Sequence, residues 1–290
     1  MVSRTLGHEI APMIKKLLVG IDASEHSRNA QAYAFHIAHR LNASLIGLHV
    51  VDIVSLEGSF FHDISGSLGL EPYLDFSSKM REVLTARGRQ VLDDFAAAAA
   101  RENLPVETVL DMGIVANQLC ERAKSADLAM IGHRGVNERF SSGLLGSTAE
   151  AVARKCPRPV FISPMKFREI RKMVLAYDGS ERASRAMRTA AEFASGMGTP
   201  IAIVTVARDQ KLGERTLEEA RKYFEPYSLP AEFKLLGGHA HEEIIKFITE
   251  YEADLLFIGA YGHSRIIEMV LGSTTEYVLR NAPCPVFLSR

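Results

Sequence analysis

The sequence predicts an α/β protein made of two tandem, doubly wound domains, each with a parallel five-stranded sheet of Rossmann-like strand order 3-2-1-4-5. Three observations support this fold class. The chain repeats itself, and within each copy short apolar runs alternate with stretches that carry apolar residues at helical spacing. Such alternation is typical of parallel sheets wound by right-handed crossovers. At 290 residues, the chain is also long enough for two domains.

The internal repeat covers most of the chain. The aligned pairs of segments are 15–38 with 171–194, 126–135 with 253–262, and 144–163 with 270–289. This alignment places Asp22 over Asp178. A repeat of this length indicates that one structural unit occurs twice. We therefore expect a first domain at residues 1–165 and a second at 166–290.

Each copy predicts the same series of elements. The first strands, LLVGI and MVLAY, are apolar runs without polar alternation, as in strands that are covered on both faces. The stretch after each of them has a core-facing apolar stripe at helical spacing. Helices are expected between the later strands, which are SLIGLHVV and PIAIVTVA, 105–110 and 231–236, DLAMI and DLLFI, and RPVFIS and CPVFLS.

The two copies differ mainly after the second strand. Residues 52–78 of the first copy form a much longer connection than residues 208–216 of the second. Loops tolerate insertions of this kind. We interpret the long segment as a surface loop, which either has no function or acts as a lid.

Composition and charge exclude several classes of protein. The 34 basic and 35 acidic residues are interspersed and give a net charge of -1, so no positive field attracts nucleic acid. No run approaches the roughly 20 apolar residues of a membrane helix. The three cysteines are far apart and unlike a zinc motif, which favours buried thiols in a reducing compartment. We expect a cytoplasmic protein.

The stretch GAYGHSRIIEMVLGSTTEYV, which begins at Gly259, indicates a ligand site. In a doubly wound sheet, ligands bind beyond the carboxyl ends of the strands, where Asp178 and Gly259 would face one crevice. Glycine lets the backbone approach a ligand closely. The N–H groups of the helix that starts near Ser273 and Thr274 suit a phosphate. Alternatively, the glycines shape a turn, Ser273 caps the helix, and Asp178 caps the helix after the first strand.

Two common phosphate-binding motifs are absent from the sequence. No segment reads G-x-x-x-x-G-K-[ST], in which a lysine reaches the phosphates. No G-x-G-x-x-G follows the first strand of either copy, which argues against a conventional dinucleotide fold.

The residues resemble those of the universal stress protein family in its tandem form. Nucleotide-binding members of that family carry G-x2-G-x9-G-[ST], and the second copy reproduces this motif at Gly259, Gly262, Gly272 and Ser273. The Asp at the end of strand one, the ADL…IG fourth strand and the PVF fifth strand add to the resemblance, which covers residues 15–290.

The resemblance implies a set of binding roles for ATP. Asp178 and the backbone near Ile201 would contact the adenine and ribose. Ribose and phosphates would be held by Gly259, Gly262, His263, Gly272, Ser273 and Thr274. Mg²⁺ commonly accompanies a triphosphate, although no carboxylate pair for it is evident near the loop.

The first copy departs from the motif. Gly132, Gly135, Gly146 and Ser147 are present, but ten residues, 136–145, separate the second and third glycines. An extra residue would displace backbone donors beyond hydrogen-bonding distance. We hypothesise that the second copy binds ATP and that the first binds it weakly or not at all.

Three functions are compatible with the sequence. The leading hypothesis is an ATP-binding regulatory protein of a stress response. The others are a slow ATPase and a nucleotide-free scaffold. Since fifth strands commonly pair between subunits in the family, the segments PVFIS and PVFLS could pair within the chain as a pseudo-dimer, and homodimerisation is left open.

Overall fold

The computed structural model describes residues 14–52, 73–135, 145–260 and 272–289. The strands of the first half are β1 (Lys16–Gly20), β2 (Ser44–Asp52), β3 (Val106–Gly113), β4 (Leu128–Gly132) and β5 (Val160–Ser163). Those of the second half are β6 (Met173–Ala176), β7 (Ile201–Val206), β8 (Ala231–Leu236), β9 (Leu255–Gly259) and β10 (Val286–Ser289).

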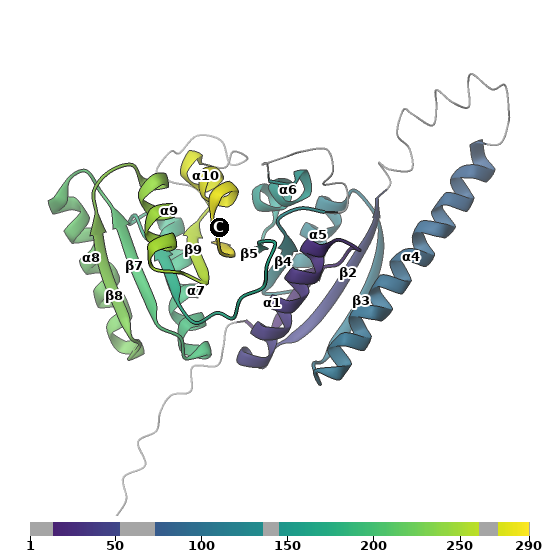
Figure 1. Cartoon of the computed structure of the whole chain (residues 1–290), viewed down its shortest axis with the longest axis horizontal. Helices are drawn as coiled ribbons and strands as arrows, with labels where there is room; N and C mark the ends of the chain where they lie inside the picture. The colour runs from purple at the N-terminus through teal and green to yellow at the C-terminus, as the bar shows by residue number, and fades with distance from the viewer. Residues whose placement is uncertain (1–13, 53–72, 136–144, 261–271, 290) are drawn as a thin grey trace, which may run out of the picture.

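The helices of the first half are α1 (Glu25–Leu41), α4 (Tyr73–Arg101), α5 (Val115–Ala123) and α6 (Ser147–Lys155). Those of the second half are α7 (Glu181–Met197), α8 (Gln210–Phe224), the 3-10 turn η2 (Glu225–Tyr227), α9 (Ala240–Glu250) and α10 (Ser273–Asn281). In Figure 1, α4 stands at the outer edge of the first half, and α6 and α10 lie near the junction of the two halves.

The ten strands of the described residues belong to one sheet in the order β3-β2-β1-β4-β5-β10-β9-β6-β7-β8 (Figure 1). Within each half the strands are parallel and follow the order 3-2-1-4-5, so the predicted fold class is confirmed. The two fifth strands pair antiparallel at the centre, with Phe161 opposite Phe287. The pairing within the chain that we expected from PVFIS and PVFLS is therefore present.

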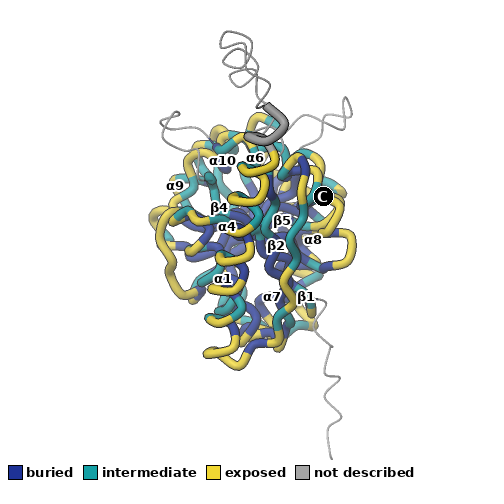
Figure 2. Tube along the Cα trace, turned by 90° about the vertical axis from the view of Figure 1, so that its right-hand side faces the viewer, coloured by how far each residue is buried: buried dark blue, intermediate teal, exposed yellow. Residues whose placement is uncertain are grey.

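The core consists of two apolar layers, one on each face of the sheet. Successive residues of one strand enter different layers: Leu17 and Val19 pack on one side, and Leu18 packs on the other. This explains why the strands read as continuous apolar runs. Buried segments occupy the interior in Figure 2, and the exposed ones lie at the periphery.

The first helix of each half begins in the same way. The hydroxyls of Ser24 and Ser180 accept hydrogen bonds from the backbone N–H groups of Ser27 and Ala183. A serine at this position satisfies a donor that the helix itself leaves unpaired. The repeated Asp-x-Ser sequence therefore fixes where both helices start.

The repeated segment ADL has a structural role in each copy. Asp127 accepts hydrogen bonds from the backbone N–H groups of Lys15 and Lys16, at the start of β1. Asp254 accepts the equivalent bonds from the segment before β6. Each carboxylate therefore holds the start of the first strand against the start of the fourth.

The segment between β5 and β6 crosses α1. The hydroxyl of Tyr33 donates to the Lys166 carbonyl at 3.2 Å and accepts from the Arg168 N–H at 3.1 Å. His36 Nε2 accepts from the Ile170 N–H at 3.4 Å, and burial lowers the pKa of this histidine. The expected domain boundary, between residues 165 and 166, lies in this segment and stays a prediction.

Part of the expected long loop is helical. Residue 52 ends β2, and α4 already begins at Tyr73. The rest of that segment, residues 53–72, lies outside the described residues, so a lid function stays a prediction. Over the described parts of the chain, no helix is long and apolar enough to cross a membrane.

Candidate functional site

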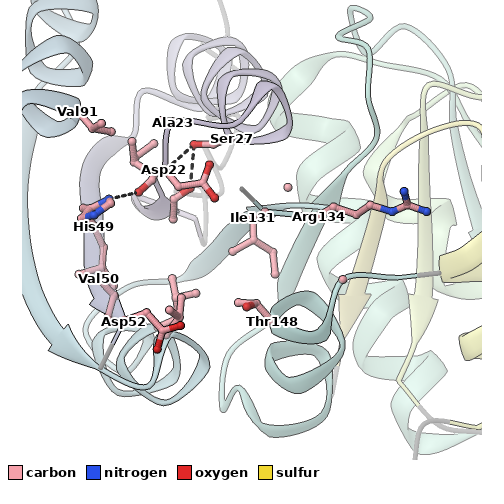
Figure 3. Close-up of a pocket in the computed structure, with 18 of the residues that line it drawn as sticks. Asp22, Ala23, Ser27, His49, Val50, Asp52, Val91, Ile131, Arg134 and Thr148 are labelled. Carbon is pink, nitrogen blue, oxygen red and sulfur yellow. Dashed lines mark hydrogen bonds between the residues drawn. The ribbon is translucent and has the colours of Figure 1, made fainter. Parts of the chain in front are cut away.

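A cavity of about 530 Å³ opens in the first half at the carboxyl ends of β1, β2 and β4 (Figure 3). Here the direction of winding reverses: β1 lies between β2 and β4, and α1 packs in one apolar layer whereas α5 packs in the other. The residues that line the cavity include Asp22, His49, Asp52, Arg87, Gly135 and Ser147. They come from β2, from α4, from the start of α6, and from the connections that follow β1 and β4.

Asp22 both shapes a turn and lines this cavity. Its Oδ1 accepts the N–H of Ser24 at 2.8 Å, and its own N–H donates to Ser27 Oγ at 2.9 Å. A Cβ on Gly135 would lie 3.2 Å from Asp22 Oδ2, so the glycine loop passes close to the carboxylate. In the second half, Asp178 Oδ1 accepts the Ser180 N–H at 3.0 Å. The alternative in which these aspartates cap the helices is therefore wrong, because Ser24 and Ser180 are the caps and each carboxylate instead closes the turn before its serine.

His49 lies on β2 beside the cavity. Its Nδ1 is 2.8 Å from the carbonyl oxygen of Ile21, an acceptor that requires the proton on Nδ1 (Figure 3). Thr205 makes the same contact in the second half, where its hydroxyl donates to the Tyr177 carbonyl at 2.9 Å. The end of the first strand is therefore tied to the second strand in both halves.

The first glycine of each motif is required by helix packing. A Cβ on Gly259 would lie 2.8 Å from the Ala183 nitrogen and 2.9 Å from the Arg182 carbonyl carbon, in the first turn of α7. A Cβ on Gly132 would lie 2.6 Å from His26 Cβ, in the first turn of α1. Such short distances leave no space for a side chain. These glycines let the first helix of each half lie against the end of the fourth strand.

The third glycine of each motif caps a helix. Gly272 is the N-cap of α10 and Gly146 is that of α6, and neither glycine has a side chain that could cap its helix. The alternative in which Ser273 is the cap is therefore wrong, because Ser273 is the first helical residue. Thr275 Oγ1 donates to the Gly259 carbonyl at 3.3 Å and fastens α10 to the end of β9. The N-terminus of α10 is thus held at the carboxyl edge of the sheet, as an anion site requires.

The structure brings together most of the described residues predicted for the second site. Asp178 follows β6, Gly259 ends β9, and Gly272, Ser273 and Thr274 begin α10. These three elements meet at the same edge of the sheet, because β6 and β9 are parallel neighbours. Gly262 and His263 lie outside the described residues.

Ile201 is the exception. It is the first residue of β7 and pairs with Met173, the first residue of β6. The length of β7 separates the two edges of the sheet by roughly 17 Å. Ile201 therefore lies at the amino edge and is fully buried, so the expectation that it contacts adenine is wrong. The β7 backbone that reaches the carboxyl edge is that of Val206 and Ala207.

The sequence interpretation missed His49, Asp52 and Arg87. His49 and Asp52 lie on one strand, and their places in the cavity follow from the pairing of β2 with β1. Arg87 comes from α4, in a part of the chain for which no site was predicted. Comparison of the copies offered one signal, which is a difference in charge. Asp52 of the first half occupies the position of Arg208 in the second half.

The histidines of the segment HAHEE lie on the surface around the start of α9. His239 is exposed, and the ring of His241 packs on that of Tyr277 with centroids 4.7 Å apart. Within the described ranges, no three His, Cys, Asp or Glu side chains come close enough to hold a metal ion.

The chain is a tandem α/β protein, in which two five-stranded units are joined through their fifth strands. A crevice lies at the carboxyl edge of the first half, and the equivalent elements of the second half lie at its own carboxyl edge. Residues 13–164 and 208–290 match the model of the universal stress protein family. The chain belongs to the universal stress protein family.

Individual relatives agree with this assignment. A universal stress protein from Synechocystis is 30% identical over 292 residues, which cover 96% of this chain and 100% of that protein. One from Thermus aquaticus is 32% identical over 133 residues, 41% of this chain and 97% of that protein. The crystal structure of a universal stress protein from Archaeoglobus fulgidus has a TM-score of 0.74 at 23% identity, over 94% of this chain and 97% of that one, and shows the same fold.

Proposed function

We propose that this protein binds ATP and acts as a nucleotide-dependent regulator of a stress response. The observation that supports the proposal best is the cavity at the carboxyl edge of the first half, where Asp22, the glycine loop and the start of α6 converge. Its volume of about 530 Å³ is typical of a small-molecule site. The internal repeat places the equivalent residues of the second half at the same edge.

The residues present fit a nucleotide. The N-cap glycine offers no side-chain acceptor to the first N–H groups of α10, and the helix dipole favours a negatively charged group there. Phosphate oxygens would be held by Ser273, Thr274 and the glycine loop, including Gly262 and His263. Asp178 would accept hydrogen bonds from ribose hydroxyls, since a carboxylate is an acceptor for two or more donors.

The adenine would lie toward β7. At the carboxyl edge, the backbone of Val206 and Ala207 takes the place that was predicted for Ile201. Mg²⁺ would be bound through the phosphates of ATP, because the described residues near α10 contain no cluster of carboxylates for it.

We propose that both halves bind ATP, with unequal affinity. The second half has the nine-residue spacing of the nucleotide-binding members, and we expect it to be the tighter site. The first half has one more residue in the loop, yet a cavity of the right size is present there. We therefore expect weaker binding in the first half.

Native mass spectrometry of the whole chain, titrated with ATP and Mg²⁺, tests this function. We expect one ATP per chain at low concentration and a second at higher concentration. Gly272→Val, which places a branched side chain at the cap of α10, should weaken the tighter site by at least about tenfold, or ~1.4 kcal/mol.

Gly237→Val is the matched control. A Cβ at Gly237 meets no atom within 4 Å, so this change should leave ATP binding unaltered. The absence of ATP binding to the wild-type chain would contradict the proposed function and leave a nucleotide-free scaffold. Equal binding by wild type and Gly272→Val would contradict the assignment of the site to α10.

A further inference from the structure

One side chain of the first glycine loop reaches the second half. His133 directly follows β4, between Gly132 and Gly135, and its Nε2 lies 2.9 Å from the carbonyl oxygen of Leu279. Leu279 is in the last turn of α10, the helix whose N-terminus forms the proposed phosphate site of the second half. The contact therefore joins the loop of one site to the helix of the other.

The Leu279 carbonyl requires a donor from outside its helix. A helical carbonyl accepts from the N–H four residues later, and that residue is Pro283, which has no N–H. Leu279 is buried, with 2% of its surface exposed. A buried carbonyl without a partner is destabilising. The imidazole N–H of His133 supplies the partner, at the negative end of the helix dipole.

His133 is also bound firmly within the first site. Its backbone N–H donates to the Ser163 carbonyl at 2.9 Å, and its carbonyl accepts from the Gly146 N–H at 3.1 Å. Gly146 is the N-cap of α6 and lines the first-half cavity. A movement of this cap on ligand binding would therefore act on the backbone of His133.

The equivalent contact is absent from the described residues on the other side. The counterpart of His133 is Ala260, whose methyl group cannot donate a hydrogen bond. The counterpart of Leu279 is Ala153 on α6, which likewise has a proline, Pro157, four residues later. Both helices are followed by a proline at this position, but at the aligned position of the loop the first half has a histidine and the second half has Ala260.

On this geometry we propose that His133 is a positioning residue that couples the two nucleotide sites. It holds the C-terminal end of α10, while Thr275 fastens the other end to Gly259. A helix of nine residues transmits a displacement from one end to the other. This inference rests on the proposed function and adds to it that occupancy of either site changes the affinity of the other, because coupling between two binding sites is reciprocal.

The size of the effect follows from the contact. A single hydrogen bond changes an equilibrium by about two- to tenfold. Only the part of this bond energy that differs between the free and the ATP-bound protein changes affinity. We therefore expect His133→Ala to weaken ATP binding at the second site by about twofold or more and by tenfold at most. His133→Gln carries an amide N–H that extends about as far as imidazole Nε2, and it should bind ATP within about twofold of wild type.

The experiment isolates the second site in the whole chain. Val115→Trp places an indole in the first-half cavity, which Val115 lines. In this background, calorimetry compares the ATP affinity of the chain that keeps His133 with the affinities of the His133→Ala and His133→Gln variants. His39→Ala is the matched control, because the ring of His39 contacts Glu102 within the first half.

Hydrogen exchange provides the readout of coupling. With Val115→Trp alone, ATP should slow amide exchange in α10 and also in residues 128–135. With His133→Ala added, ATP should slow exchange in α10 only. A purely structural role of His133 would change the unfolding midpoint without altering which segments respond to ATP.

The outcomes separate the inference from the proposed function. If His133→Ala binds ATP as tightly as its parent, or if residues 128–135 still respond to ATP without His133, the inference is wrong while the function stands. If Val115→Trp binds no ATP although wild type does, the ligand occupies only the first half, and the inference is also wrong. If wild type binds no ATP, the proposed function fails, and the inference with it.

Discussion

Replacing Phe287 with Ala is expected to lower the free energy of unfolding by about 3–5 kcal/mol. Phe287 is fully buried on β10, directly opposite Phe161 in the antiparallel pair that joins the two halves. Its ring also packs against Phe257 at 4.8 Å and Phe193 at 5.9 Å between centroids. Removing it would leave a cavity where the cores of both halves meet, and the surrounding strands cannot close in to fill it.

Urea unfolding followed by circular dichroism measures this loss. Phe287→Leu keeps most of the apolar volume and should cost less than about 1.5 kcal/mol. Leu212→Ala, at a residue that is 60% exposed, should stay within about 0.5 kcal/mol of wild type. A loss for Phe287→Ala no larger than that for Leu212→Ala would show that the junction of β5 and β10 contributes little to stability.

The sequence predicted the fold well because each local signal agreed with the others. The strands are buried on both faces, so their apolar runs could be identified without knowledge of their neighbours. The internal repeat then supplied each element twice, and the alignment of Asp22 with Asp178 marked the end of the first strand in both halves. The pairing of β5 with β10 was expected from the family resemblance, because fifth strands commonly pair between subunits in that family and this chain carries two of them.

The details of the site depended on distances that no local pattern contains. Ile201 was assigned to adenine through the family resemblance, although it begins the predicted strand PIAIVTVA and ligands bind at the carboxyl ends of strands, which Val206 and Ala207 reach. His49 and Arg87 come from elements that are far from the glycine loop in sequence. The contact of His133 with Leu279 joins residues of different halves, so a comparison of one copy with the other could not reveal it.

The glycines show that residues of one sequence motif can have different structural roles. In the sequence, Gly259 and Gly272 both belong to a pattern that is read as phosphate binding. In the structure, Gly259 is needed for contact with α7, whereas Gly272 has φ -61°, which any residue adopts, and caps a helix that points to the site. Packing therefore accounts for the first glycine, and the start of α10 accounts for the third.

Gly259→Ala is accordingly expected to destabilise the protein by about 1–3 kcal/mol even without nucleotide. The new methyl group would lie 2.8 Å from the Ala183 nitrogen and 2.9 Å from the Arg182 carbonyl carbon. Both are backbone atoms, so no side-chain rotation can relieve the contact. The first turn of α7 would have to move away from β9, and Ala183, which is only 3% exposed, would lose part of its packing. Urea unfolding in nucleotide-free buffer measures the change.

Gly237→Ala is the control, since it makes the same substitution where a Cβ meets no atom within 4 Å. It should leave the free energy of unfolding within about 0.5 kcal/mol of wild type. If Gly259→Ala is as stable as this control, α7 can shift without cost and the packing explanation is wrong. If Gly259→Ala is destabilised as expected, any reduction in its ATP binding reports on the position of α7. Direct contact with phosphate is then tested by Gly272→Val instead.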